Sequence, residues 1–206
     1  MRLTYQLAGF FMGLLVLSAA PSAQTTGPES EAVVVVEKLH NTLLEAMKNA
    51  EKLGFRGRYD IMAPVVESSF DTPLIVQVVL SRYWKELTPA QQGQFVVLFN
   101  RLSASTYASR FDSYAEESFK TQSVEEMKKG RLLVKTELLR KNENPVKLEY
   151  LVQQNGGKWY IISVIADGVN DLALKRAEYA TIINDKGFDN LVGEIEKKIH
   201  ELEATH

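Results

Sequence analysis

Apolar residues recur at helical spacing through the first half of the chain, alternate with polar residues through a central stretch, and return to helical spacing near the end. Spacings of three and four residues predict helices with one buried face, and alternation predicts strands. We therefore expect an α+β architecture, in which helices flank one antiparallel sheet of three to four strands. The expected helices span residues 31–52, 55–70, 74–84, 89–111, 172–184 and 188–202, and the expected strands span residues 119–126, 132–140, 146–154 and 158–166.

Short local motifs mark where these elements begin and end. Asp71 precedes a proline that suits the first turn of a helix, and residues 88–91 (Thr-Pro-Ala-Gln) form a capping box. Residues 155–157 (Asn-Gly-Gly) separate two alternating runs and predict a hairpin. Residues 167–171 are read as a turn into a helix that is capped by Asn170 or Asp171. The last strand should place Trp159, Ile161, Ser163 and Ile165 on one face, and Tyr160, Ile162 and Val164 on the other.

The N-terminus has the pattern of an export signal. Arg2 precedes an apolar run over residues 7–17, and small residues follow it. Eleven apolar residues are too few to span a bilayer comfortably, so we expect a signal peptide over residues 1–23, cut between residues 20 and 24, rather than an uncleaved anchor. We expect a flexible leader over residues 24–30, a single domain over residues 31–206, and an exported protein.

Composition narrows the possible chemistry. The chain has no cysteine, which excludes disulfides, thiolate metal sites and the lipobox of a lipoprotein. Without Arg2, 23 basic residues remain against 26 acidic ones, for a net charge of −3. This balance argues against nucleic-acid binding, which needs clustered positive charge.

Catalytic and metal-binding motifs are missing from the sequence. The three histidines, His40, His200 and His206, are best explained as helix-surface residues. Residues 167–171 superficially resemble a calcium loop, but the later glutamate ligand is missing. We therefore expect no catalytic residue, no metal, no cofactor and no enzymatic activity.

An ordered set of motifs spans nearly all of the chain after the signal. The motifs are Arg58–Val66, Phe70-Asp71, Tyr83-Trp84, Leu87–Gln92, Phe95–Phe99, Lys158–Ile162, Asp167–Val169, Lys175–Tyr179 and Gly187–Leu191. The set resembles the toluene-tolerance family of periplasmic auxiliary proteins of ABC-type lipid transporters, the MlaC-like phospholipid shuttles. Residues 167–179 are more similar to the hopanoid-associated, HpnM-type branch than to the ordinary one. The resemblance implies a single lipid-binding domain over residues 31–206 and a periplasmic location.

The resemblance implies a fold that encloses an apolar lipid cavity with the headgroup at its mouth. Our candidate polar residue near the mouth is Arg176, although a surface salt bridge to Glu178 or Asp171 explains it equally well. For each apolar candidate the alternative is ordinary core, because periodicity shows burial but not whether lipid fills the space. The apolar candidates are Val76, Val79, Leu98, Leu102, Tyr107, Val134, Leu138, Tyr150, Ile162 and Val164.

Three functions stay open from the sequence. The first is a carrier that ferries a phospholipid or hopanoid across the periplasm. The second is an adaptor that docks on a transporter and holds no lipid, and the third is a lipid-modifying hydrolase. For the carrier, the resemblance implies an inner-membrane transporter component as partner and, at the other membrane, a lipoprotein complex. Because shuttles meet partners briefly, we expect a monomer with small docking surfaces.

Overall fold

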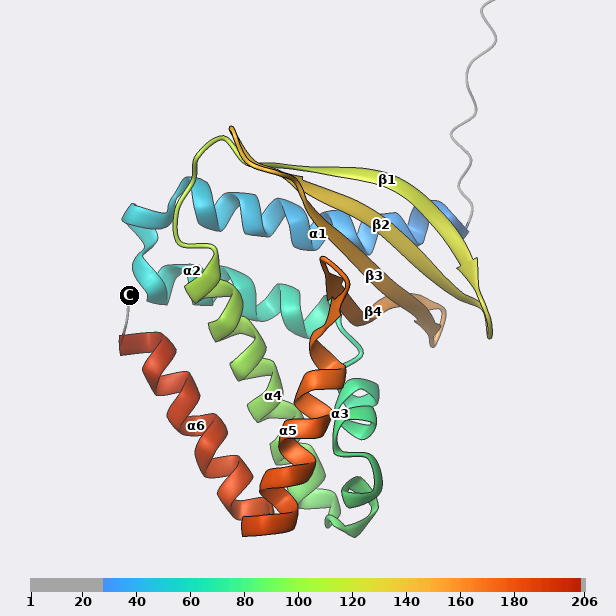
Figure 1. The fold of residues 1–206 in the computed structure, drawn as a ribbon, viewed down its shortest axis with the longest axis vertical. Coiled ribbons are helices and arrows are strands. Elements are labelled where there is room, and N and C mark those ends of the chain that lie inside the picture. The colour runs from blue at the N-terminus through green and yellow to red at the C-terminus, as the bar shows by residue number, and fades with distance from the viewer. Residues whose placement is uncertain (1–27, 205–206) are drawn as a thin grey trace, which may run out of the picture.

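The computed structural model describes residues 28–204, and the expected signal peptide lies outside them. The described part holds six α-helices, one 3₁₀ helix and five strands (Figure 1). The helices are α1 (Pro28–Lys48), α2 (Ala50–Ser69), α3 (Thr72–Leu80), the 3₁₀ helix η1 (Ser81–Glu86), α4 (Pro89–Arg110), α5 (Asp171–Lys186) and α6 (Phe188–Ala204). The strands are β1 (Ser118–Met127), β2 (Arg131–Leu139), β3 (Val146–Asn155), β4 (Lys158–Ala166) and β5 (Val169–Asn170).

The strands form one antiparallel sheet in the order β1-β2-β3-β4-β5, which confirms the α+β expectation. The sheet has five strands rather than three to four, because a two-residue strand pairs with the end of β4. Asp167 and Gly168 make that pairing possible, since both have positive φ angles and turn the chain back on itself. In Figure 1 the sheet curves over α1, and α3 to α6 form the opposite half of the molecule.

Local capping motifs place the helix starts where the sequence predicts them. The Asp71 carboxylate accepts a hydrogen bond from the backbone N–H three residues later, at the start of α3. Thr88 and Gln91 form the capping box of α4. The Asn170 side chain caps α5, which decides between the two expected caps. Each of these motifs acts over a few residues, so the sequence alone is enough to find them.

The first two helices divide differently from the expectation. α1 ends at Lys48, where the Asn49 side chain donates to the Glu45 carbonyl and competes with the backbone. Gly54, expected to end the first helix, is instead a kink inside α2, with φ 57° and ψ −174°. Only glycine adopts this conformation at little cost, so the kink requires Gly54.

Two further helix boundaries differ from the expectation. α1 begins at Pro28, inside the segment 24–30 that was expected to be a flexible leader. α3 ends at Leu80 rather than continuing through residue 84, because Ser81 has φ 54° and cannot continue an α-helix. The chain then forms η1, which is a tighter helix.

The β3–β4 hairpin confirms the expected turn and corrects the expected faces of β4. Gly156 and Gly157 form the two-residue turn, and both have positive φ angles. Beyond the turn, Val152 pairs with Ile161 but the preceding residue pairs with Ser163, which leaves Ile162 as a β-bulge. A bulge reverses the alternation, so Val164 lies on the face of Ile161 and Trp159, contrary to the prediction.

The interior consists of two hydrophobic clusters. The first fills the space between the sheet and helices α1 and α2, and the second lies among α3, α4, α5 and α6. Phe70, at the end of α2, packs against both clusters and pairs with Ile161 through an isolated β-bridge. The fully buried members of the first cluster are Ala32, Val36, Leu39, Met62, Val134, Val152 and Ile161.

Candidate functional site

An open groove lies between the first turns of α1 and the adjacent ends of the sheet. Its volume is about 1020 Å³, a size that suits a large organic ligand. The walls come from α1, from β1 and β2 around their turn, and from the β3–β4 hairpin, which meet at one end of the molecule (Figure 1). The apolar residues that line the groove are Val33, Val34, Val124, Met127, Leu132 and Trp159.

The groove is continuous with the first hydrophobic cluster. Leu132 belongs to that cluster, and Val33, Val124 and Trp159 pack against it while also lining the groove. Val34 also lines the groove and is 62 % exposed, so the apolar lining extends to the solvent side of α1. An apolar surface therefore runs from solvent into the interface between α1 and the sheet.

A buried hydrogen-bonded pair in the middle of this interface joins α1 to the sheet. His40 Nε2 of α1 lies 2.9 Å from the Tyr150 hydroxyl of β3, and the His40 ring stacks on Phe119 of β1 with centroids 3.9 Å apart. His40 is 3 % exposed, so the expectation of a helix-surface histidine was wrong at this position. Burial lowers its pKa from 6.5 to about 4. The imidazole is therefore neutral at physiological pH.

Two buried tyrosines keep the same interior uncharged. Burial raises the pKa of Tyr150 well above its ordinary value, with a smaller contribution from Tyr107. Burial also raises the pKa of Tyr107, whose ring packs near Phe70 and Phe111. With both phenols and His40 neutral, these polar groups add no charge to an environment suited to hydrocarbon.

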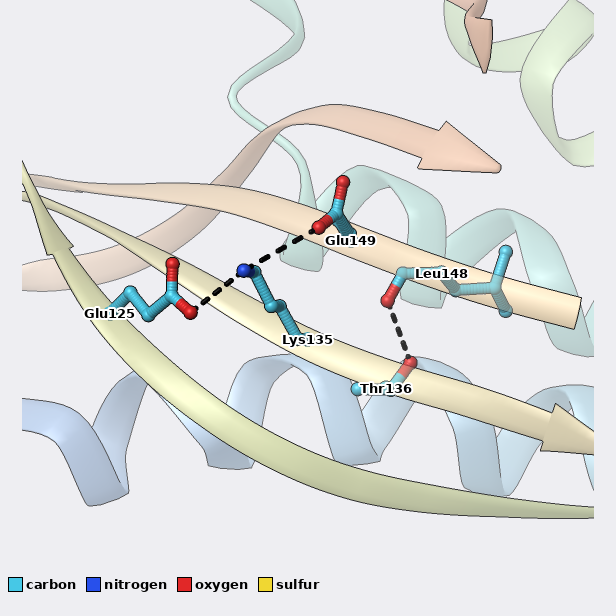
Figure 2. Close-up of polar contacts among 5 residues, drawn as sticks. All are labelled: Glu125, Lys135, Thr136, Leu148 and Glu149. Carbon is cyan, nitrogen blue, oxygen red and sulfur yellow. Dashed lines mark hydrogen bonds and ion pairs between the residues drawn. The ribbon is translucent and has the colours of Figure 1, made fainter. Parts of the chain in front are cut away.

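Acidic residues on the rim of the groove and acidic residues on the opposite face of the sheet differ in whether they form ion pairs. Glu29, Glu37 and Glu126 line the groove and form no ion pair among the described residues. On the opposite face, Lys135 Nζ lies 2.7 Å from Glu125 and 3.9 Å from Glu149, as Figure 2 shows.

A second, smaller cavity of about 510 Å³ lies where α1, α2 and the end of α4 meet. Arg58, 3 % exposed, lines it and donates from Nε to the Ala108 carbonyl and from Nη1 to the Ala50 carbonyl. These bonds supply hydrogen-bond donors to one carbonyl in the last turn of α4 and to one carbonyl shortly before the Gly54 kink. Arg58 therefore has a structural role in holding α2 to α4.

The structure does not place any of the eleven predicted site residues among those that line the groove. Tyr107, Val134, Tyr150 and Val164 lie in or against the first cluster, next to α1. Leu138 and Ile162 are buried elsewhere on the sheet. Four of the five predicted residues on α3 and α4 belong to the second cluster: Val76, Val79, Leu98 and Leu102.

Arg176 lies on the surface of α5, away from the groove. Its Nη2 donates to the Ser81 hydroxyl at 3.1 Å, at the strained junction between α3 and η1. The expected alternative, a salt bridge to Glu178 or Asp171, does not form; Asp171 lies near Lys175 instead.

Most groove residues were missed because they belong to expected elements for which only the buried face was considered. Glu29, Ser30, Met127, Gly130 and Arg131 lie outside the expected helices and strands. One sequence signal could have shown that α1 lines a groove. Residues 33–36 are four consecutive valines, and four consecutive residues of a helix cannot all lie on one buried face. Met127, 44 % exposed beside a turn, is a similar signal. That these segments meet follows only from the curvature of the sheet over α1.

Within residues 28–204, no group of three or more His, Asp or Glu side chains could hold a metal ion. His200 is exposed and lies 3.5 Å from Glu203 on the same helix. Among the helices described, none combines the length and the apolar character needed to cross a membrane.

Comparison with known proteins identifies relatives over most of the chain. Residues 37–197 match the family described as "MlaC protein". Toluene tolerance protein ttg2D of Pseudomonas putida is 26 % identical over 197 residues, which is 90 % of this chain and 90 % of that protein. The fold is similar to that of a phospholipid-binding protein from Ralstonia solanacearum, solved in complex with a phospholipid. The TM-score is 0.72 at 18 % identity, covering 84 % of this chain and 97 % of the other.

Proposed function

The chain belongs to the MlaC family, and from this premise we propose that it is a periplasmic carrier that holds the apolar part of a phospholipid and moves it between membrane-bound partners. The observation that carries the proposal is the apolar groove that continues into the uncharged interface between α1 and the sheet. The phospholipid bound to the Ralstonia protein, which shares the fold, supports a phospholipid as the ligand. Family membership also supports a carrier rather than an enzyme.

The energetics of the cargo explain why an apolar site is needed. Moving one methylene out of water is worth about 0.8 kcal/mol, so two acyl chains of about 16 carbons represent more than 20 kcal/mol. A carrier must shield most of this surface while it crosses water. It must also release the lipid, which favours non-directional apolar contact over strong polar bonds.

In this proposal the acyl chains enter from the groove, and α1 and the sheet move apart to admit them into the interface that the first cluster fills in this structure. Val33, Val124 and Leu132 line the opening, and the predicted residues Val134 and Tyr150 lie deeper in the same cluster. Tyr107 and Val164 pack against that cluster and stay candidates for tail contact. The other seven predicted residues have no part in this route.

The partners, the oligomeric state and the alternative cargo are proposed from the family likeness. We propose exchange with an inner-membrane transporter component and with an outer-membrane lipoprotein complex, by a monomeric carrier. A hopanoid cargo stays a prediction from the motif over residues 167–179.

Lipid extraction tests the proposal directly. The full chain is exported to the periplasm, purified without detergent, extracted with organic solvent and analysed by mass spectrometry, and the stripped protein is then mixed with phospholipid vesicles. We expect about one phospholipid per chain, and reloading from the vesicles. A clean extract with no reloading would favour the adaptor, and hydrolysed lipid appearing with time would favour the hydrolase.

A further inference from the structure

The rim of the groove carries three carboxylates that form no ion pair with a basic side chain of residues 28–204. Glu29 and Glu37 come from α1 and Glu126 from β1, and all three are exposed and line the groove. Glu126 lies on the α1 side of the sheet, since it pairs with Leu132, which is a member of the first cluster. The acidic rim therefore borders the apolar surface on which lipid tails are proposed to lie.

Basic residues also lie at the opening of the groove, around the turn between β1 and β2 rather than on α1. Arg131 lines the groove, and its Nε donates to the Gln153 side chain at 2.8 Å. Lys128 and Lys129 are exposed in the turn between β1 and β2, directly after Met127. The mouth thus presents cations on the hairpin and carboxylates along α1 and the end of β1.

This arrangement of charges matches a zwitterionic headgroup. Resting on the function proposed above, we propose that the groove selects phospholipids whose headgroup carries an amine over those with an anionic headgroup. All phospholipids share the phosphate, which the hairpin cations attract equally in every case. The headgroups differ in the group attached to the phosphate. An ammonium group is attracted by the carboxylates of Glu29, Glu37 and Glu126. A glycerol group carries no positive charge, so the negative phosphate lies uncompensated beside these carboxylates.

The expected preference is modest because the carboxylates are exposed. Exposed ion pairs change an equilibrium by about 1.4-fold to fivefold each. Glu29 and Glu37 lie eight residues apart on α1, about 12 Å along the helix axis, so one ammonium pairs with one or two of the three carboxylates at a time. We therefore expect a preference of about three- to tenfold at low salt. Because surface charges are screened, the preference should shrink when the ionic strength rises to about 1 M.

The test is a competition in which both lipids come from the same membrane. Lipid-free full-length protein is incubated with vesicles of equimolar phosphatidylethanolamine and phosphatidylglycerol, and the bound lipids are extracted and counted by mass spectrometry. The test variant is Glu37→Gln with Glu126→Gln. The matched control is Glu125→Gln with Glu137→Gln, which removes the same net charge from the opposite face of the sheet, where Glu125 pairs with Lys135 (Figure 2).

We expect the wild-type protein and the control to bind phosphatidylethanolamine in about three- to tenfold excess, and the E37Q/E126Q variant to bind the two lipids in nearly equal amounts. Equal binding by the wild-type protein would overturn the proposal. An equal change in both variants would also overturn it, because net charge rather than the rim would then set the ratio. Failure of all three proteins to bind either lipid would instead contradict the carrier function itself.

Discussion

His40 makes the polar contact between α1 and the sheet, and its burial predicts a specific dependence of stability on pH. The unfolded chain has a histidine pKa of 6.5, and burial lowers the folded value to about 4. Above pH 6.5 both forms are neutral and the group has no effect. As pH falls from 6.5 towards 4, the unfolded chain binds a proton that the folded chain does not, so the free energy of unfolding decreases.

The size of this effect follows from the two pKa values. Their difference corresponds to roughly 3 kcal/mol, fully lost near pH 4. We expect urea unfolding of the wild-type protein to lose roughly 3 kcal/mol more between pH 7 and pH 4 than that of His40→Gln. The control His200→Gln changes an exposed histidine and should behave as the wild type. Equal pH dependence in the wild type and H40Q would contradict the assignment.

The fluorescence of Trp159 should report whether lipid enters the groove, because Trp159 lines it. The chain has one other tryptophan, Trp84. In the variant Trp84→Phe, we expect the fluorescence of Trp159 to move to shorter wavelength when lipid vesicles are added, since hydrocarbon replaces water beside the indole. The variant Trp159→Phe leaves Trp84, on η1, and should show no such change. An unchanged spectrum in W84F, despite lipid bound by mass spectrometry, would place the lipid elsewhere.

At the scale of elements, the proposed site predicts that lipid binding depends on α1. We expect Val34→Gln to weaken lipid binding about three- to tenfold, because it puts a polar amide on the apolar wall of the groove. Val97→Gln is the matched control: Val97 of α4 is 60 % exposed, against 62 % for Val34, and does not line the groove. Vesicle reloading measures both, and equal losses would exclude a special role for α1.

The start of α3 links the two halves of the molecule. Asp71 caps α3, accepts a hydrogen bond from the Asn155 side chain at 2.9 Å, and donates its backbone N–H to Ile161. We expect Asp71→Ala to lower the free energy of unfolding by about 2–3 kcal/mol, since it removes the cap and leaves Asn155 unpaired. Thr88→Ala removes a cap alone and should cost about 1 kcal/mol. Similar losses in the two variants, measured by urea unfolding, would show that the Asn155 contact contributes little.

The sequence predicted those elements whose signals are local. The caps at Asp71, Thr88 and Asn170 and the turn at Gly156-Gly157 act over a few residues, and the structure confirms each one. The early end of α3 at Ser81 and the bulge at Ile162 depend on packing between distant segments. No alternation of apolar residues along one strand can reveal them, so the faces of β4 were predicted wrongly.

The candidate site was less predictable than the fold for the same reason. Periodicity found Val134 and Tyr150 as buried residues, and both lie next to α1. It also selected Val76 and Leu98, which are equally buried but belong to the second cluster. Burial alone does not distinguish a packed core from the wall of a binding site. The groove becomes visible only when α1 and the hairpins are placed side by side.

The whole molecule combines a compact helical half with a half in which one helix lies under a curved sheet. The second cluster buries α3 to α6 against one another, whereas the first cluster opens at one end into the groove. This arrangement is consistent with the proposed carrier: the helical half formed by α3 to α6 can stay packed while α1 and the sheet move apart to admit acyl chains. Within that interface the His40–Tyr150 hydrogen bond is a polar contact among apolar residues of the first cluster.

Site-specific photocrosslinking tests the central claim most directly. A photoreactive phenylalanine analogue is placed at Val34 in the groove or at Val97 on α4, two positions of nearly equal exposure, and each protein is irradiated after loading from phospholipid vesicles. The account predicts a phospholipid adduct by intact-protein mass spectrometry at Val34 and little or none at Val97. Adducts of equal yield at both positions, or at Val97 alone, would contradict a binding site between α1 and the sheet.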